Sequence, residues 1–312
     1  MNIRCFQRRL SAVAPSSFPT PMASLQPPSR SETHFWYVIP DEINCTSLLN
    51  RYMEILTPCE KENVLTMAGD QLQKRALLAR ALVRTTIARY QTNCFVDPRS
   101  LKFRKNRYGK PELELQSDDD IQLRKIQFNI SHTSSLIACG VTTNSPIGID
   151  VEEKQRKTKN NMLAFVKRYF SPHEFKRLSS ISDFEAQSQE FIKLWTLKEA
   201  YVKALGKGFS AAPFKTFTIR LSGGVKGCFE LTEGLDSEAS EIRVESLDDS
   251  KNLTSNWQFV LAELEGSHYA AICNVPLRLT AWKTIPFVED KCASGTDAIV
   301  TIGGMVKHNV VA

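Results

Sequence analysis

Apolar residues recur every three or four positions in two long stretches of the chain, Asp70–Tyr90 and Glu185–Leu205. This spacing is that of one buried helix face, so it predicts two long helices, the second ending at Gly206. Shorter helices are expected at Ser47–Ile55, at Leu163–Tyr169 and from the N-cap Ser171 onward.

Runs of aromatic and β-branched residues predict strands before and after these helices. They are His34–Ile39, Ile126–Ile130, Leu136–Val141, Ile147–Val151, Phe214–Leu221, Cys228–Leu231, Ile242–Glu245, Trp257–Glu263 and Tyr269–Cys273. The chain thus begins with a strand, continues with helices and strands, and then repeats helices and strands. This order is typical of an α+β protein built from two similar halves.

The same pattern divides the 312 residues into four segments. We expect an N-terminal half at 32–145 and a C-terminal half at 146–285. Residues 286–312 lack clear periodicity and are expected to be a tail, and residues 1–31 are a leader.

The leader contains four arginines, several serines and prolines, and no acidic residue. This composition is typical of an organelle transit peptide, and the long apolar core of a secretory signal is missing. Arg4, Arg8 and Arg9 alternate with apolar residues as in a short basic amphipathic helix, which favours mitochondria over plastids. A disordered tail on a cytosolic protein is the remaining alternative.

Charge and cysteine usage exclude several functional classes. The net charge is +6, and the leader carries +4 of it, so the remaining chain carries only +2, which argues against a nucleic-acid binder. None of the 8 cysteines forms a C-x-x-C pair, so we expect free thiols in a reducing compartment and no zinc site. No apolar stretch approaches the roughly 18 residues of a membrane span.

The segment Gly148–Glu152 places two acidic residues on a predicted strand. Residues two apart on a strand share a face, so Asp150 and Glu152 point the same way while Ile149 and Val151 face the core. Neighbouring carboxylates are tolerated when they are solvated or when they share a cation. With oxygen ligands that cation would be Mg²⁺ or Mn²⁺.

The segment Trp195–Lys203 lies on the second long helix. Trp195, Glu199 and Lys203 follow one another at i, i+4 and i+8 along one face. Glu199 and Lys203 could be an ordinary surface pair. Alternatively, Glu199 is a third metal ligand, and Lys198 and Lys203 supply positive charge for phosphates.

Three further segments carry candidate residues that are common on protein surfaces. Lys110 follows Gly109 in a tight turn, Ser131 and His132 end a predicted strand, and Arg75 lies on the first long helix. Each could simply be solvated, although His132, flanked by hydroxyl groups, could also bind a phosphate.

The acidic strand, the segment on the second long helix and the three further segments are more informative together than each is alone. RYGKP at 107–111, FNISHT at 128–133, IGIDVEE at 147–153 and WTLKEAYVK at 195–203, in this order, resemble the 4′-phosphopantetheinyl transferase superfamily, and most of all its larger, two-half Sfp-type members. The resemblance covers roughly residues 35–275. It departs from the family at Pro58–Asn63, which has a single lysine, and at Ala76, where some relatives have a hydroxyl residue.

The resemblance implies an α+β fold of two pseudo-symmetric α/β halves, each a long helix on a mainly antiparallel sheet, with the active site in the cleft between them. It implies transfer of the phosphopantetheine arm of coenzyme A to a serine of an apo acyl carrier protein, with release of adenosine 3′,5′-bisphosphate. Asp150, Glu152 and Glu199 would hold Mg²⁺, or Mn²⁺. The residues implied to contact the phosphates of coenzyme A are Arg75, Lys110, Ser131, His132, Lys198 and Lys203.

The resemblance leaves the catalytic base open. Phosphoryl transfer needs in-line positioning and neutralised charge. Glu199, directly or through a metal-bound water, is the first candidate to accept the proton of the carrier serine. Lys203 is the other candidate base, or it would instead assist the leaving phosphate.

The expected protein partner is an acyl carrier protein, whose acidic helix would meet the basic loop Lys154–Lys159. A single chain with both halves is expected to act as a monomer. The main alternative is an inactive relative that binds carrier protein or coenzyme A.

Overall fold

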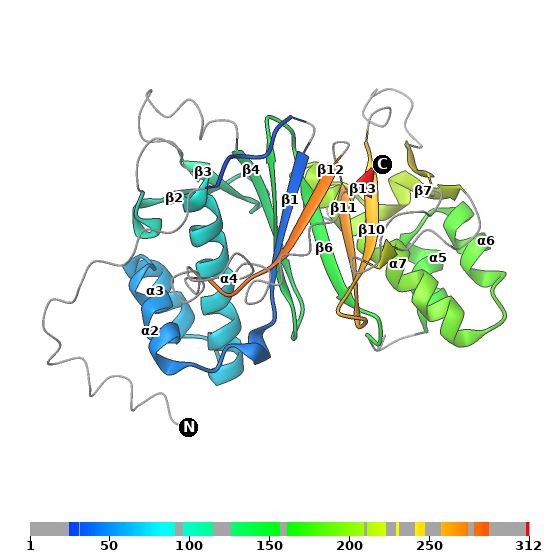
Figure 1. Ribbon diagram of the computed structural model, residues 1–312. Helices are drawn as coiled ribbons and strands as arrows, with labels where there is room; N and C mark the ends of the chain where they lie inside the picture. The colour runs from blue at the N-terminus through cyan, green and yellow to red at the C-terminus, as the bar shows by residue number, and fades with distance from the viewer. Residues whose placement is uncertain are drawn as a thin grey trace, which may run out of the picture.

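The computed structural model describes residues 25–30, 32–90, 96–114, 126–156, 161–208, 211–222, 229–230, 241–246, 257–273, 278–286 and 310–311. Among these residues, two long helices lie on the outer faces of two sheets that pack against each other (Figure 1). In this part of the chain no helix is long and apolar enough to cross a membrane.

Five strands form the first sheet in the order β13-β12-β1-β5-β4. Their bounds are β1 Glu32–Val38, β4 Ile126–His132, β5 Ile137–Thr143, β12 Arg278–Lys283 and β13 Val310–Val311. Helix α4, Asp70–Arg89, covers its outer face with the help of α2, Thr46–Glu54, and α3, Pro58–Leu65 (Figure 1). The long helix predicted at Asp70–Tyr90 and the one at Ser47–Ile55 are confirmed.

The second sheet has four strands in the order β6-β11-β10-β8. The strands are β6 Gly148–Glu153, β8 Phe229–Glu230, β10 Phe259–Leu264 and β11 His268–Cys273. Its helices are α5 Met162–Tyr169, α6 Pro172–Ser179 and α7 Phe184–Ala204. The remaining strands form two-stranded sheets, β2 Lys102–Lys105 with β3 Pro111–Glu114 and β7 Phe217–Ser222 with β9 Glu241–Ser246.

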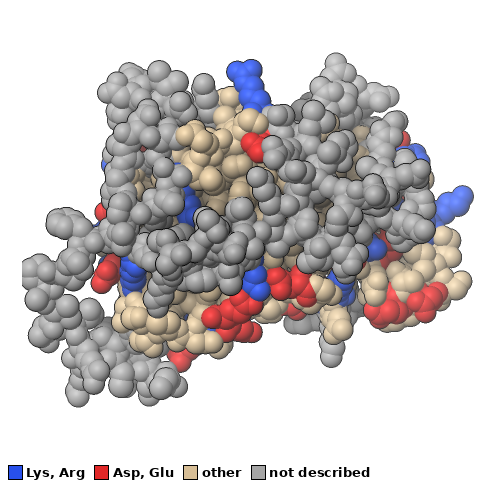
Figure 2. All heavy atoms as spheres, viewed as in Figure 1, with Lys and Arg blue, Asp and Glu red and all other residues tan. Residues whose placement is uncertain are grey.

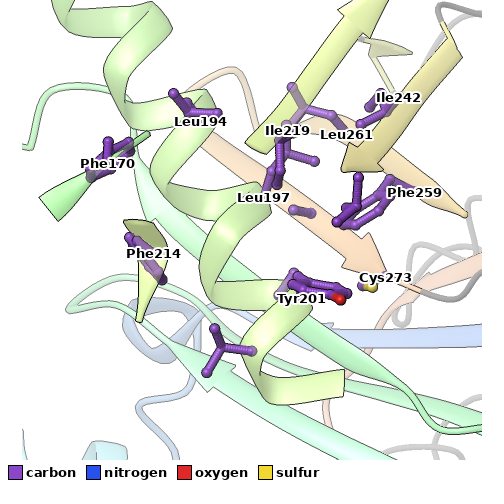
Figure 3. Packing of buried hydrophobic residues seen from close by; sticks show 14 of the residues in the cluster. Phe170, Leu194, Leu197, Tyr201, Phe214, Ile219, Ile242, Phe259, Leu261 and Cys273 are labelled. Carbon is purple, nitrogen blue, oxygen red and sulfur yellow. The ribbon is translucent and has the colours of Figure 1, made fainter. Parts of the chain in front are cut away.

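The core lies in three clusters that follow from the strand period of two. On β1, Trp36 and Val38 face the α4 side, whereas Phe35 and Tyr37 face the second sheet. Around α7 a third cluster forms, in which Leu194, Leu197 and Tyr201 pack on strands of the C-terminal half (Figure 3). Both faces of the first sheet are therefore buried, and the predicted α+β class with mostly antiparallel pairing is confirmed.

Local signals explain where the shorter helices start. Ser171 caps α6 in a capping box with Glu174, as the sequence predicts. Thr57 and Glu60 form a second capping box at the start of α3, a helix that the apolar pattern does not reveal because Val64 is its only buried side chain.

Three segments differ from the expectation. Strand β12 falls within the predicted C-terminal half, yet it pairs in parallel with β1 in the sheet of the N-terminal half. Strand β13, in the predicted tail, pairs with β12. Leu25, within the predicted leader, donates its backbone N–H to the Arg89 carbonyl at 2.7 Å and packs against the core, so the end of that leader belongs to the folded body.

Candidate functional site

Strand β6 presents its two acidic residues on one face, as the strand period predicts. Ile149 and Val151 are buried in the core at 0% and 2% exposure. Asp150 is also buried, at 4% exposure, and Glu152 is half-buried. The strand therefore sets two carboxylates side by side at the surface that helix α7 covers.

Helix α7 lies directly on β6 because the strand begins with a glycine. A Cβ atom at Gly148 would lie 1.9 Å from the Ala200 carbonyl oxygen and 2.2 Å from the Ala204 nitrogen. Only a residue without a side chain permits this approach. The small residues Ala200 and Ala204, one turn apart, complete the contact between helix and strand.

This contact brings the polar face of α7 to the acids of β6. The Lys203 ammonium donates to Asp150 Oδ1 at 2.6 Å, and the Trp195 indole N–H donates to Glu152 Oε1 at 2.9 Å. Glu199 lies between Trp195 and Lys203 in the helix and interacts electrostatically with Asp150 and Lys203. The predicted i, i+4, i+8 face is therefore the one that meets the strand.

Ser131 joins the N-terminal half to these groups. Its hydroxyl donates to Asp150 Oδ1 at 2.9 Å and accepts from the Lys203 ammonium at 3.0 Å and from the Val151 N–H at 3.2 Å. The hydroxyl proton is thus directed at Asp150, and Ser131 supports the carboxylate in this structure.

His132 follows Ser131 and is exposed. Partial desolvation of the ring next to the protein surface, together with the positive charges of Lys203 and Arg75, lowers the pKa of its imidazole. Arg75, from α4, is thus within electrostatic reach of His132. Ser131 and Lys203 therefore contact Asp150 directly, His132 is the next residue of the strand, and Arg75 is linked to this group only through its charge effect on His132.

The carboxylates have the charge properties of a cation site. Burial and the negative charge of Asp150 raise the pKa of Glu152 to about 7, and they also raise the pKa of Glu199. Asp150 Oδ2 is buried without a hydrogen-bond partner among the described residues. An all-oxygen set with an unpartnered buried oxygen fits Mg²⁺ or Mn²⁺. The described residues nevertheless contain no three His, Cys, Asp or Glu side chains already arranged as a metal cluster.

Lys198 differs from the expected phosphate contact. Its side chain is fully buried on another face of α7, where the ammonium pairs with Glu174 Oε1 at 2.8 Å and donates to the Phe214 and Phe217 carbonyls. Burial lowers its pKa to about 8. Because no part of the ammonium is exposed, Lys198 serves the core of the C-terminal half in this structure.

Lys110 also has protein partners. Its ammonium donates to the Ile147 and Lys203 carbonyls, both at 2.8 Å, and burial lowers its pKa to about 8. In the same turn Asn106 Nδ2 donates to the Gly206 carbonyl at 3.0 Å. The β2–β3 turn of the N-terminal half therefore holds the end of α7 and the start of β6.

The described part of the predicted basic loop is paired within the chain. Lys154 pairs with Glu263, and Arg156 pairs with Glu152 and lies over the Trp195 ring at 5.2 Å. Lys157 and Lys159 lie outside the described residues. Arg156, a member of the predicted basic loop, is thus a neighbour of the acidic pair.

Two supporting residues also escaped the sequence analysis. Asn129 precedes Ser131 by two, so the strand period could have placed both on one face. Glu174 carries no sequence signal for its ion pair with Lys198, because the sequence already explains it as the capping-box residue of α6.

Comparisons with known proteins agree with these features. Residues 146–273 match the model of the 4′-phosphopantetheinyl transferase superfamily. Residues 44–143 match the model described as 4′-phosphopantetheinyl transferase, N-terminal.

Individual relatives give the same result. The 4′-phosphopantetheinyl transferase Sfp of Bacillus subtilis is 34% identical over 172 residues, which cover 55% of this chain and 69% of Sfp. A 4′-phosphopantetheinyl transferase of Nostoc sp. is 30% identical over 179 residues, covering 57% of this chain and 70% of the relative. A phosphopantetheinyl transferase of Thraustochytrium sp. is 25% identical over 245 residues, covering 76% and 78%.

Proposed function

Because this chain belongs to the 4′-phosphopantetheinyl transferase superfamily and is a transferase of that kind, we propose that it moves the phosphopantetheine arm of coenzyme A to a serine of an apo acyl carrier protein. In this reaction the serine Oγ forms a bond to the phosphorus that carries the arm. The pyrophosphate bond breaks, adenosine 3′,5′-bisphosphate leaves, and the serine loses its proton.

One observation carries the proposal. Lys203 from α7, Asp150 from β6 and Ser131 from β4 meet within hydrogen-bond distance, with Glu152 and Glu199 beside them. Transfer at a pyrophosphate needs positive charge next to the phosphates and a group that accepts a proton. The arrangement supplies both from elements on either side of the junction between the halves.

We propose that Asp150, Glu152 and Glu199 hold a magnesium ion, for which manganese could substitute. When bound, the ion would neutralise charge on the pyrophosphate of coenzyme A. The pKa values of Glu152 and Glu199, raised chiefly by burial and then by the charge of Asp150, support this assignment, because a bound cation would stabilise the charged carboxylates.

The residues of the chain have separate roles in this proposal. Glu199 accepts the serine proton. Lys203 keeps positive charge beside the transferred phosphoryl group. Exposed His132 and nearby Arg75 contact the phosphates of coenzyme A. For Lys110 such a contact requires the ammonium to leave one of its two carbonyl partners.

The carrier protein is proposed to approach beside Glu152. Lys167 and Arg168 on α5 are exposed, and Phe165 of the same helix packs against Trp195, the residue that donates to Glu152. Together with the loop Lys154–Lys159, in which Lys154 and Arg156 are paired with Glu263 and Glu152 in this structure, they would offer local positive charge to an acidic helix. On the face that Figure 2 shows, the described Lys and Arg side chains are scattered.

We further propose a mitochondrial location, with plastid and cytosol as alternatives, because residues 1–31 combine four arginines with no acid. A monomer is proposed because both halves of the site come from one chain. Imaging of the full chain fused to a fluorescent protein and light scattering would test these two points.

The function is tested by supplying coenzyme A and magnesium with a panel of apo carrier proteins and by identifying the nucleotide product chromatographically. We expect adenosine 3′,5′-bisphosphate with at least one carrier, and none after chelation by EDTA. Coenzyme A binding without any nucleotide release across the panel would overturn the proposal in favour of an inactive binding module.

A further inference from the structure

β4 is an edge strand of the first sheet and β6 is an edge strand of the second. The two strands lie next to each other, although they belong to different sheets and do not pair as neighbours in either one. Strand β6 pairs with β11 on one side, in a register that aligns Asp150 with Ala271. Successive backbone N–H groups of a strand point to alternate sides. The N–H groups of Ile149 and Val151 therefore face away from β11 and toward β4.

Side chains of β4 take the place of a backbone partner there. Asn129 Oδ1 accepts the Ile149 N–H at 2.8 Å, and Ser131 Oγ accepts the Val151 N–H at 3.2 Å. The acceptors and the donors are each two residues apart, so the bonds form a regular ladder between the halves. Asn129 is 4% exposed, so water offers the Ile149 N–H little replacement.

Asp150 lies between the two rungs of this ladder. Ser131 forms one rung and also donates to Asp150 Oδ1. Asn129 forms the other rung at the residue before Asp150, and its recorded bond is to the backbone of Ile149. Any effect of Asn129 on the carboxylate therefore passes through the position of β6.

We propose that Asn129 is a positioning residue for the transfer reaction: by accepting the Ile149 N–H across the junction of the halves, it fixes β6 against β4 and so places Asp150 relative to Ser131 and Lys203. The inference rests on the proposed function, but it concerns a residue that is not itself expected to touch substrate or metal.

The test compares Asn129→Asp with Asn129→Ser. Aspartate keeps an acceptor oxygen at the same reach, whereas serine is too short to meet the Ile149 N–H. Gln127→Ala is the matched control, because Gln127 is exposed on the same strand. Far-UV circular dichroism and thermal unfolding establish that each variant is folded, and Asn129→Ala is the harsher third variant.

Two readouts separate this inference from the proposed function. Binding of Mn²⁺, followed by the electron paramagnetic resonance signal of the free ion, needs no turnover. We expect the Kd for Mn²⁺ to be about tenfold higher in Asn129→Ser than in the wild type. In Asn129→Asp and Gln127→Ala we expect Mn²⁺ to bind at least as tightly as in the wild type. In turnover we expect kcat to fall by about tenfold or more in Asn129→Ser while KM for coenzyme A changes little.

The inference is overturned if folded Asn129→Ser binds Mn²⁺ like the wild type, or if Asn129→Asp loses as much affinity as Asn129→Ser, since the acceptor would then be irrelevant. If the wild-type protein releases no nucleotide, the proposed function is contradicted but the inference about Asn129 is not, because the comparison of Mn²⁺ binding still decides the role of Asn129.

Discussion

Replacing Gly148 by alanine should push helix α7 away from strand β6. The added Cβ would lie 1.9 Å from the Ala200 carbonyl oxygen, and real Cβ contacts essentially never fall below 3.0 Å. The difference, 1.1 Å, is the smallest displacement that relieves the clash. The opposing atoms belong to the helix backbone, so no side-chain rotation can absorb it.

The displacement has consequences for stability and for activity. Overpacking of a core contact costs about 1–3 kcal/mol, and a clash with backbone should reach the upper end of that range. Lys203 and Glu199 move with the helix, and a misplacement of about 1 Å in a catalytic group can lower the rate by 10²-fold. We therefore expect Gly148→Ala to lose about 3 kcal/mol of unfolding free energy and about two orders of magnitude in kcat.

Chemical denaturation and initial-rate kinetics measure these two effects. Gly208→Ala is the control, because a Cβ at Gly208 meets nothing within 4 Å. Wild-type kcat in a folded Gly148→Ala variant would refute the reasoning, since it would mean that the approach of α7 to β6 does not set the position of Lys203.

Three further predictions follow from the buried charges and histidine. Lys198→Met should destabilise the protein by about 3–5 kcal/mol in chemical denaturation, because Glu174 would keep a buried charge without its partner, and Glu174→Gln added to Lys198→Met should restore part of the loss. Lys110→Met should weaken the hold of the β2–β3 turn on α7 and lower kcat, whereas a change confined to KM for coenzyme A would favour the phosphate contact instead. Burial lowers the pKa of His268 in the folded protein below its usual value of 6.5, so at pH values just below 6.5 the unfolded chain binds more protons than the folded one. The free energy of unfolding should therefore fall as the pH drops below about 6.5. Denaturation of His268→Gln at several pH values should show a flatter dependence in this range.

Periodicity predicted much of the fold because each half is built from long regular elements. Asp150 and Glu152 share a face by the strand period, and Trp195, Glu199 and Lys203 share one by the helix period. These local rules need no knowledge of the neighbours. They located the acids and the lysine that meet in the structure.

The sequence did not show which elements would be neighbours. Strand β12 pairs with β1 from the opposite end of the chain, and nothing in either segment specifies that partner. The contact of α7 with β6 depends on Gly148, whose role appears only when the helix is in place.

Lys198 shows an avoidable error. Lys203 is five positions further along the helix, and at about 100° per residue the two side chains point about 140° apart. Only Lys203 can therefore share the face of Glu199. Treating both lysines as phosphate ligands overlooked this angle, and the structure pairs Lys198 with Glu174 in the core.

The most direct test of the central claim is the intact mass of an apo acyl carrier protein after incubation with the full-length chain, coenzyme A and magnesium. The account predicts a gain of one phosphopantetheine arm with the wild type, no gain with Asp150→Ala, and no gain when the target serine of the carrier is replaced by alanine. An unchanged gain with Asp150→Ala would contradict the assignment of the site to β6 and α7.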